Sequence, residues 1–147
     1  MMSVTDFTYT VTVNSTPEKA IADICRVSKW WATDLAGHTE RSGDRFTVRF
    51  PDTWVAFRVA RIVANREIVW DVEDCHLSWL SDKTEWKGTQ IVWKISASGG
   101  TTEIQFTHVG LVPEIECYKD CAVGWSSYLQ KSLRKLLEEN QGLPDQF

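Results

Sequence analysis

The sequence predicts an α+β fold in which a curved antiparallel β-sheet wraps around one long C-terminal helix, with short helices near the N-terminus. Apolar and polar side chains alternate along several segments, which is typical of antiparallel strands that bury one face and leave the other in water. Between Tyr118 and Leu136 the apolar period changes to that of a helix. Only this helix is long enough to cover the buried face of the sheet.

The elements near the N-terminus follow from alternation and from a helix-start signal. Residues 6–14 alternate apolar side chains with threonine, which predicts the first strand. Ser15 and Glu18 fit a capping box, and Pro17 is tolerated in the first turn of a helix. We expect this short helix to end near Ser28.

The remainder of the chain predicts more strands and the closing helix. Further strands are expected at residues 45–50, 53–63, 67–73, 87–97 and 101–109. Residues 74–86 mix polar and apolar side chains without a period, so they are expected to form a loop over the body. The long helix is expected from Glu114 to about Glu139, because Gly142 and Pro144 stop it.

Composition and charge limit the class of protein. The 147 residues are expected to form one domain spanning 1–147. The net charge of −4 argues against a nucleic acid or an anionic membrane as partner. No apolar segment approaches the ~20 residues of a membrane span, and no signal peptide is visible, so we expect a cytoplasmic protein without membrane insertion. No phosphate loop or dinucleotide fingerprint is present, and no cofactor is expected.

The four cysteines are Cys25, Cys75, Cys117 and Cys121. Without an export signal they are expected to be reduced thiols. Cys117 and Cys121 lie one helical turn apart and could form a zinc site with Cys75 and His76, but the usual CxxC knuckle is absent. Buried cysteine commonly packs as a small hydrophobe, so no metal site is expected.

Four segments carry a resemblance to a known family: STPEKAIADICRVSKWW, RIVANREIVWDVE, GGTTEIQFTHVGL and GWSSYLQKSLRKLLE. They resemble the SRPBCC superfamily, which includes START lipid-transfer domains, the birch-pollen-allergen family and polyketide cyclases. The similarity is closer to the branch related to the C-terminal domain of the activator of the ninety-kilodalton heat-shock protein ATPase. The resemblance covers nearly the whole chain. It implies a helix-grip fold, a START-like domain with a cavity between sheet and helix.

The eight tryptophans raise the question of a ligand. Trp30 and Trp31 are neighbours, so both rings cannot enter one core from one regular element, and one is expected to face the cavity mouth. The inward aromatic residues predict either a well-filled core or a pocket for an apolar ligand. The expected ligand-binding residues are Trp31, Phe57, Trp70, Trp93, Phe106, His108, Cys121, Trp125 and Tyr128.

His108 is the one histidine expected on an inward strand face. Such a histidine is usually a satisfied core residue, and only a weak candidate for a general acid or base. No carboxylate is expected on the same face, so no catalytic residue is assigned. Tyr128 and Ser132 lie one turn apart on the long helix, where each is expected either to offer a polar group to the cavity or to face solvent.

Three functions remain open on these observations. The first is a protein that binds a hydrophobic or aromatic small molecule in the cavity. The second, which the resemblance implies, is a co-chaperone-like regulator of the ninety-kilodalton heat-shock chaperone. The chaperone would then be the protein partner. The third is a cyclase, dehydratase or hydrolase that uses His108. Binding ranks first, and the sequence leaves the oligomeric state open.

Overall fold

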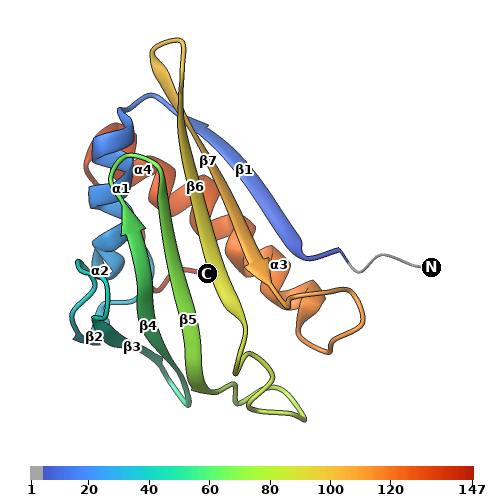
Figure 1. Ribbon diagram of the computed structural model, residues 1–147. Helices are drawn as coiled ribbons and strands as arrows, with labels where there is room; N and C mark the ends of the chain where they lie inside the picture. The colour runs from blue at the N-terminus through green and yellow to red at the C-terminus, as the bar shows by residue number, and fades with distance from the viewer. Residues whose placement is uncertain (1–4) are drawn as a thin grey trace.

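The computed structural model describes residues 5–147, so the first four residues of the expected domain lie outside the described range. Within this range one antiparallel sheet of seven strands has the order β1-β7-β6-β5-β4-β3-β2. The sheet curves around the C-terminal helix (Figure 1). The strands are β1 (Phe7–Val13), β2 (Asp34–Gly37), β3 (Arg45–Phe50), β4 (Thr53–Val63), β5 (Glu67–His76), β6 (Gln90–Ser98) and β7 (Thr101–Val109).

Two short helices, α1 (Pro17–Cys25) and α2 (Val27–Trp30), connect β1 to β2. The C-terminal helix is one continuous rod made of α3 (Tyr118–Ser127), the π-helical segment η1 (Tyr128–Leu133) and α4 (Arg134–Glu139). No helix in residues 5–147 combines the length and the apolar character needed to cross a membrane. The sheet gripping one long helix confirms the predicted helix-grip fold.

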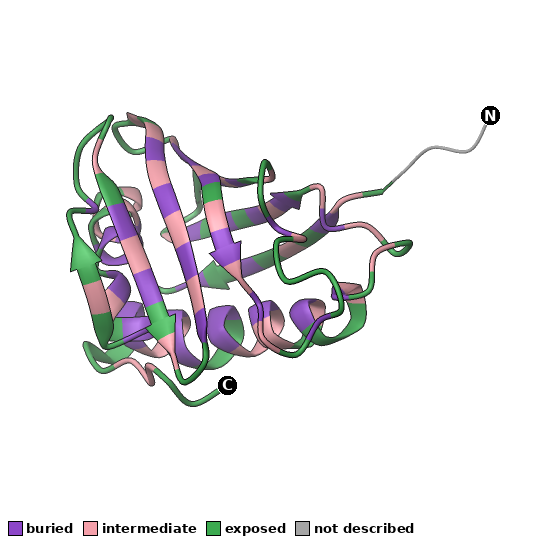
Figure 2. Ribbon diagram, turned by 90° about the horizontal axis from the view of Figure 1, so that it is seen from below, coloured by how far each residue is buried: buried purple, intermediate pink, exposed green. Residues whose placement is uncertain are grey.

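The buried face of the sheet is built from alternate residues of its strands, as the sequence pattern predicts (Figure 2). On neighbouring strands Trp93 is paired with Phe106, and their rings meet edge to face with centroids 4.9 Å apart. Trp30, Trp70 and Trp93 are all fully buried. Aromatic pairs of this kind add to the free energy gained from burial alone.

Within residues 5–147, three buried indole N–H groups, those of Trp70, Trp86 and Trp93, have no hydrogen-bond partner. Each of these rings has an edge-to-face aromatic neighbour, including Phe46 against Trp70 and His108 against Trp86. Edge-to-face pairs of this kind are favourable arrangements of two aromatic rings.

The start of α1 differs from the sequence expectation by one residue. Thr16, rather than Ser15, is the N-cap, and its hydroxyl accepts a hydrogen bond from the Lys19 amide at 3.1 Å. The backbone carbonyl of Ser15 instead accepts from the Thr102 hydroxyl at 2.7 Å. The contact with β7 therefore places residue 15 before the helix, and Thr16 supplies an equivalent cap.

Other boundaries also move. The structure contains β2, which the sequence did not predict because four residues show too little alternation. β5 continues to His76, and the long helix begins at Tyr118 rather than Glu114. The helix ends as expected, because Asn140 adopts a left-handed conformation (φ 59°) that reverses the chain.

The π-helical segment η1 has a packing rationale. The buried residues Cys121, Trp125, Leu129 and Leu133 recur every four residues. With 3.6 residues per turn, such a stripe drifts around an α-helix, and a wider π turn rotates it back. The segment thus keeps the apolar stripe facing the sheet.

The expectation of four reduced cysteines is wrong for one pair. Cys117 and Cys121 form a disulfide, with Cα atoms 5.5 Å apart, a separation that one helical turn supplies. Cys25 and Cys75 are free and buried. Burial raises the pKa of Cys25 to about 11, which keeps this thiol protonated. Among residues 5–147, no three histidine, cysteine or acidic side chains gather closely enough to hold a metal ion.

Candidate functional site

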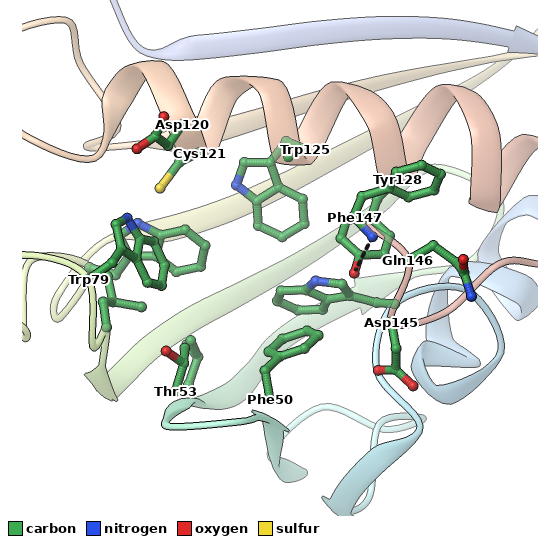
Figure 3. Close-up of a pocket in the computed structure, with 15 residues that line it drawn as sticks. Phe50, Thr53, Trp79, Asp120, Cys121, Trp125, Tyr128, Asp145, Gln146 and Phe147 are labelled. Atoms are coloured by element: carbon green, nitrogen blue, oxygen red, sulfur yellow. Dashed lines mark hydrogen bonds between the residues drawn. The ribbon is translucent and has the colours of Figure 1, made fainter.

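A pocket of about 570 Å³ opens between α3, the neighbouring ends of β3 and β4, the loop after β5, and the C-terminal residues 140–147 (Figure 3). Its walls are mainly aromatic. We call it the aromatic pocket, and its aromatic lining consists of Trp31, Phe50, Trp79, Trp86, Trp125, Tyr128 and Phe147.

The wall on the helix side is a series of tryptophans whose rings contact one another, two pairs stacked and one pair tilted. The rings of Trp86 and Trp125 are nearly parallel, at 14°, with centroids 5.8 Å apart. Trp31 follows, with its centroid 4.8 Å from that of Trp125. On the core side, the Trp30 ring stacks on the Trp31 ring, with centroids 5.9 Å apart. The adjacent tryptophans therefore have different environments, because Trp30 is fully buried in the core and Trp31 lines the pocket.

The orientation of Trp125 is set by His108. The Trp125 indole N–H donates to His108 Nδ1 at 3.1 Å, so Nδ1 carries no proton. His108 Nε2 lies 2.9 Å from the Thr89 hydroxyl and must be the donor in that bond. The Thr89 hydroxyl in turn donates to the Trp86 carbonyl at 2.6 Å. This chain ties two walls of the pocket to β7.

His108 is held in its neutral form. Burial lowers the pKa of His108 to about 3, because a charged imidazolium would lose its hydration. Both ring nitrogens are already hydrogen-bonded, and the residue does not line the pocket. An acid–base role for His108 would need a free nitrogen facing the ligand, and this arrangement provides none.

The C-terminal residues complete the pocket. The Asp145 amide donates to the Trp31 carbonyl at 2.8 Å, and its carboxylate accepts from the Thr33 amide and hydroxyl. The Phe147 amide donates to the Tyr128 hydroxyl at 3.2 Å, and the two rings meet edge to face. Burial raises the pKa of Tyr128, so its hydroxyl stays protonated at neutral pH.

Charge in the lining is of one sign. Asp120 on α3 and Asp145 lie on different sides of the pocket (Figure 3), and no lysine, arginine or histidine lines it. Neither aspartate forms an ion pair with any residue from 5 to 147. The polar remainder is neutral and includes Thr53 and Gln146.

The structure brings together four of the nine residues expected from the sequence to bind a ligand, Trp31, Cys121, Trp125 and Tyr128. The other five lie beneath the lining and are fully buried: Phe57, Trp70, Trp93, Phe106 and His108. Strand parity correctly indicates that these five face inward, but it does not separate the filled part of the interior from the open part. Ser132 faces neither pocket nor solvent, because its hydroxyl donates to the Trp30 carbonyl at 2.6 Å.

Sequence reasoning missed Phe50, Trp79, Trp86 and Phe147. Trp79 and Trp86 lie in the loop that follows β5, and Phe147 is the last residue of the sequence. For Trp79 and Trp86 the signal in the sequence was the presence of two large aromatic side chains in a segment without a strand or helix period. Loops often carry binding residues, so large aromatic side chains in such a segment were the available clue.

Comparison with known proteins places the chain in a family. The family described as "Activator of Hsp90 ATPase homolog 1-like protein" matches residues 19–138. The chain belongs to this family. The match confirms the resemblance to the SRPBCC superfamily and to this branch of it. No curated protein matches the chain.

Several solved structures have the same fold as this protein. The Aha1 dimer from Colwellia psychrerythraea is 21% identical with a TM-score of 0.78, and the match covers 94% of this chain and 99% of that one. The protein BH1534 from Bacillus halodurans is 14% identical with a TM-score of 0.69, over 93% and 100%. CalU16 from Micromonospora echinospora is 12% identical with a TM-score of 0.65, over 86% and 73%. At these identities the likeness concerns the fold alone.

Proposed function

We propose that this protein binds one apolar or aromatic small molecule in the aromatic pocket. The observation that carries the proposal is the contrast between two parts of one interior. Under the sheet the tryptophans are packed without exposed surface, whereas under α3 seven aromatic side chains surround about 570 Å³ of open space. This volume lies in the range of small-molecule sites, which are mostly apolar with a few polar groups.

Two partly exposed aromatic side chains at the mouth of the aromatic pocket support the same function. Trp79 and Phe147 both line the pocket, and their exposed fractions are 49% and 47%. Burial of apolar surface is favourable by roughly 25 cal/mol for each Å² removed from water. A ligand seated between them would remove this apolar surface from solvent.

Gly124 provides a direct test, because it lines the pocket and its Cβ position has no neighbouring atom within 4 Å. A Gly124→Phe substitution would place a ring in the open space without a backbone clash. The matched control is Val123→Phe, one residue earlier on α3, where the side chain is 63% exposed and does not line the pocket.

The measurement is energy transfer from tryptophan to N-phenyl-1-naphthylamine, a neutral aromatic probe. We expect saturable transfer at one site in the wild type and in Val123→Phe, and its loss in Gly124→Phe, with all three proteins equally folded by circular dichroism. Equal transfer in the two phenylalanine variants would place the probe elsewhere, and absence of saturable transfer in the wild type would contradict the proposal.

The family supports a second candidate function, regulation of the ninety-kilodalton heat-shock chaperone. The observation that favours it is the match to the Aha1 dimer over 94% of this chain. We expect such a regulator to raise the ATPase rate of the chaperone from the same organism in proportion to occupancy. An unchanged rate at saturating concentrations, together with no binding by calorimetry, would exclude it.

A further inference from the structure

We propose that the ligand is an organic cation, a protonated amine or quaternary ammonium attached to an apolar body. This inference rests on the proposed function and adds the charge of the ligand to it. It comes from the composition of the lining, which combines seven aromatic side chains and two aspartates without any basic residue.

Aromatic walls favour a cation over an anion. The face of an indole or benzene ring carries partial negative charge, and an ammonium group within about 6 Å of the ring centroid is attracted to it. Tryptophan is the strongest of these rings, and four tryptophans line the pocket. The Phe147 ring already shows such a contact, because the Lys131 ammonium lies 5.4 Å from its centroid.

The two aspartates of the lining also favour a positively charged ligand. Asp120 extends from α3 next to Cys121, and Asp145 lies across the pocket beside Gln146 (Figure 3). Thr33 donates two hydrogen bonds to the Asp145 carboxylate, through its amide at 3.2 Å and its hydroxyl at 2.5 Å, which fixes its position. Within residues 5–147 neither carboxylate forms an ion pair with a basic side chain, so no cation of the protein neutralises this side of the lining.

Lys83, in the loop after β5, and Lys131, on η1, are both engaged outside the lining. The Lys83 ammonium donates to the carbonyls of Ser78 and Leu80, at 3.1 and 2.8 Å, and holds the loop after β5. Lys131 lies over the ring of Phe147, and neither lysine lines the pocket. An anion would therefore meet π faces and carboxylates, and both repel it.

A matched ligand series tests the charge alone. Benzylammonium, benzyl alcohol and benzoate share one ring and carry a charge of +1, 0 and −1 at pH 7. We would titrate each into ¹⁵N-labelled protein and follow the indole N–H signals. From the strength of cation–π contacts we expect benzylammonium to bind about tenfold more tightly than benzyl alcohol, and benzoate most weakly.

Variants and salt separate the two sources of attraction. In Asp120→Asn/Asp145→Asn we expect benzylammonium to bind about threefold more weakly and benzyl alcohol to be unaffected, because these exposed charges are partly screened. The control is Glu139→Gln, an exposed carboxylate on α4 that does not line the pocket. Raising sodium chloride to 0.5 M should weaken binding of the cation and leave that of the alcohol unchanged.

The outcomes distinguish this inference from the proposed function. If N-phenyl-1-naphthylamine binds in the pocket but benzylammonium binds no more tightly than benzyl alcohol, the ligand is not a cation and the proposed function stands. If neither this probe nor any member of the series binds, both fail. Tighter binding of the cation that is unchanged in Gly124→Phe would place it outside the pocket and also overturn the inference.

Discussion

The indole N–H of Trp125 donates a hydrogen bond to Nδ1 of His108 at 3.1 Å, and this contact joins the wall of the aromatic pocket to the interior of β7. It fixes the tautomer of His108 and the orientation of the Trp125 ring together. A histidine that sequence reasoning considers as a weak catalytic candidate thereby becomes a positioning residue for a tryptophan that lines the pocket. Its neutral state also has a consequence for stability.

We expect His108 to make the folded state sensitive to acid. In the folded protein burial lowers the pKa of His108 to about 3, against an ordinary value of 6.5 in the unfolded chain. Below pH 6.5 the unfolded state therefore binds more protons than the folded state, and the free energy of unfolding decreases as the pH falls. Between pH 7 and pH 5 the decrease due to this residue should be roughly 2 kcal/mol.

The check is the urea midpoint as a function of pH for the wild type, His108→Gln and His38→Gln. Glutamine does not titrate, so His108→Gln should be less stable at pH 7 but lose this part of the pH dependence. His38 is exposed and far along the chain from His108, and its variant serves as the control for replacing a histidine. The same slope in all three proteins would contradict the assignment.

Trp30 and Trp79 should separate stability from binding. Trp30 is fully buried and its N–H donates to the Ile24 carbonyl at 3.1 Å, so Trp30→Ala should cost about 3–5 kcal/mol of unfolding free energy. Trp79 is half-exposed at the pocket mouth, and Trp79→Ala should change stability by about 0.5 kcal/mol or less while weakening binding of N-phenyl-1-naphthylamine. Urea denaturation and probe titration measure the two effects, and a comparable stability loss in both variants would be against this division.

Ser132 should be a structural link between the long helix and the C-terminal residues. Its hydroxyl donates to the Trp30 carbonyl and accepts from the Leu143 amide, at 2.6 and 2.7 Å. Ser132→Ala removes the partner of the buried Trp30 carbonyl and of the part-buried Leu143 amide, which should cost about 1–3 kcal/mol and speed hydrogen exchange at Leu143. Ser126, whose hydroxyl donates to the Ala122 carbonyl one turn earlier in the helix, is the control, and Ser126→Ala should leave exchange at Leu143 unaffected.

Two glycines should respond oppositely to alanine. A Cβ at Gly142 would overlap the backbone carbonyl of Lys29, so Gly142→Ala should displace residues 140–147 and accelerate hydrogen exchange at Phe147. Gly124 lies within α3 with open space around its Cβ position, so Gly124→Ala should stabilise the protein by up to about 1 kcal/mol. Slower exchange or higher stability in Gly142→Ala would show that the C-terminal residues are not packed as described.

Local patterns in the sequence were sufficient for most of the fold. Alternation placed the strands at residues 45–50, 53–63 and 101–109 at their observed bounds, because side chains on a strand alternate between the two faces of a sheet. The helical period of apolar residues gave the closing helix and its end. Local patterns were weaker at β2, at the cap of α1 and at the Cys117–Cys121 pair, where contacts with other elements or covalent chemistry decide the outcome.

By itself, then, the sequence determined the architecture, the inward face of each long strand and the family, since these depend on periods and motifs that are written locally along the chain. Tertiary structure alone decided which inward residues are packed and which surround open space. Trp93 and Trp125 are both predicted to face inward, yet the first is fully buried and the second lines the pocket. That difference depends on where α3, the loop after β5 and Phe147 come together, and periodicity carries no information about the volume left between elements distant in the chain.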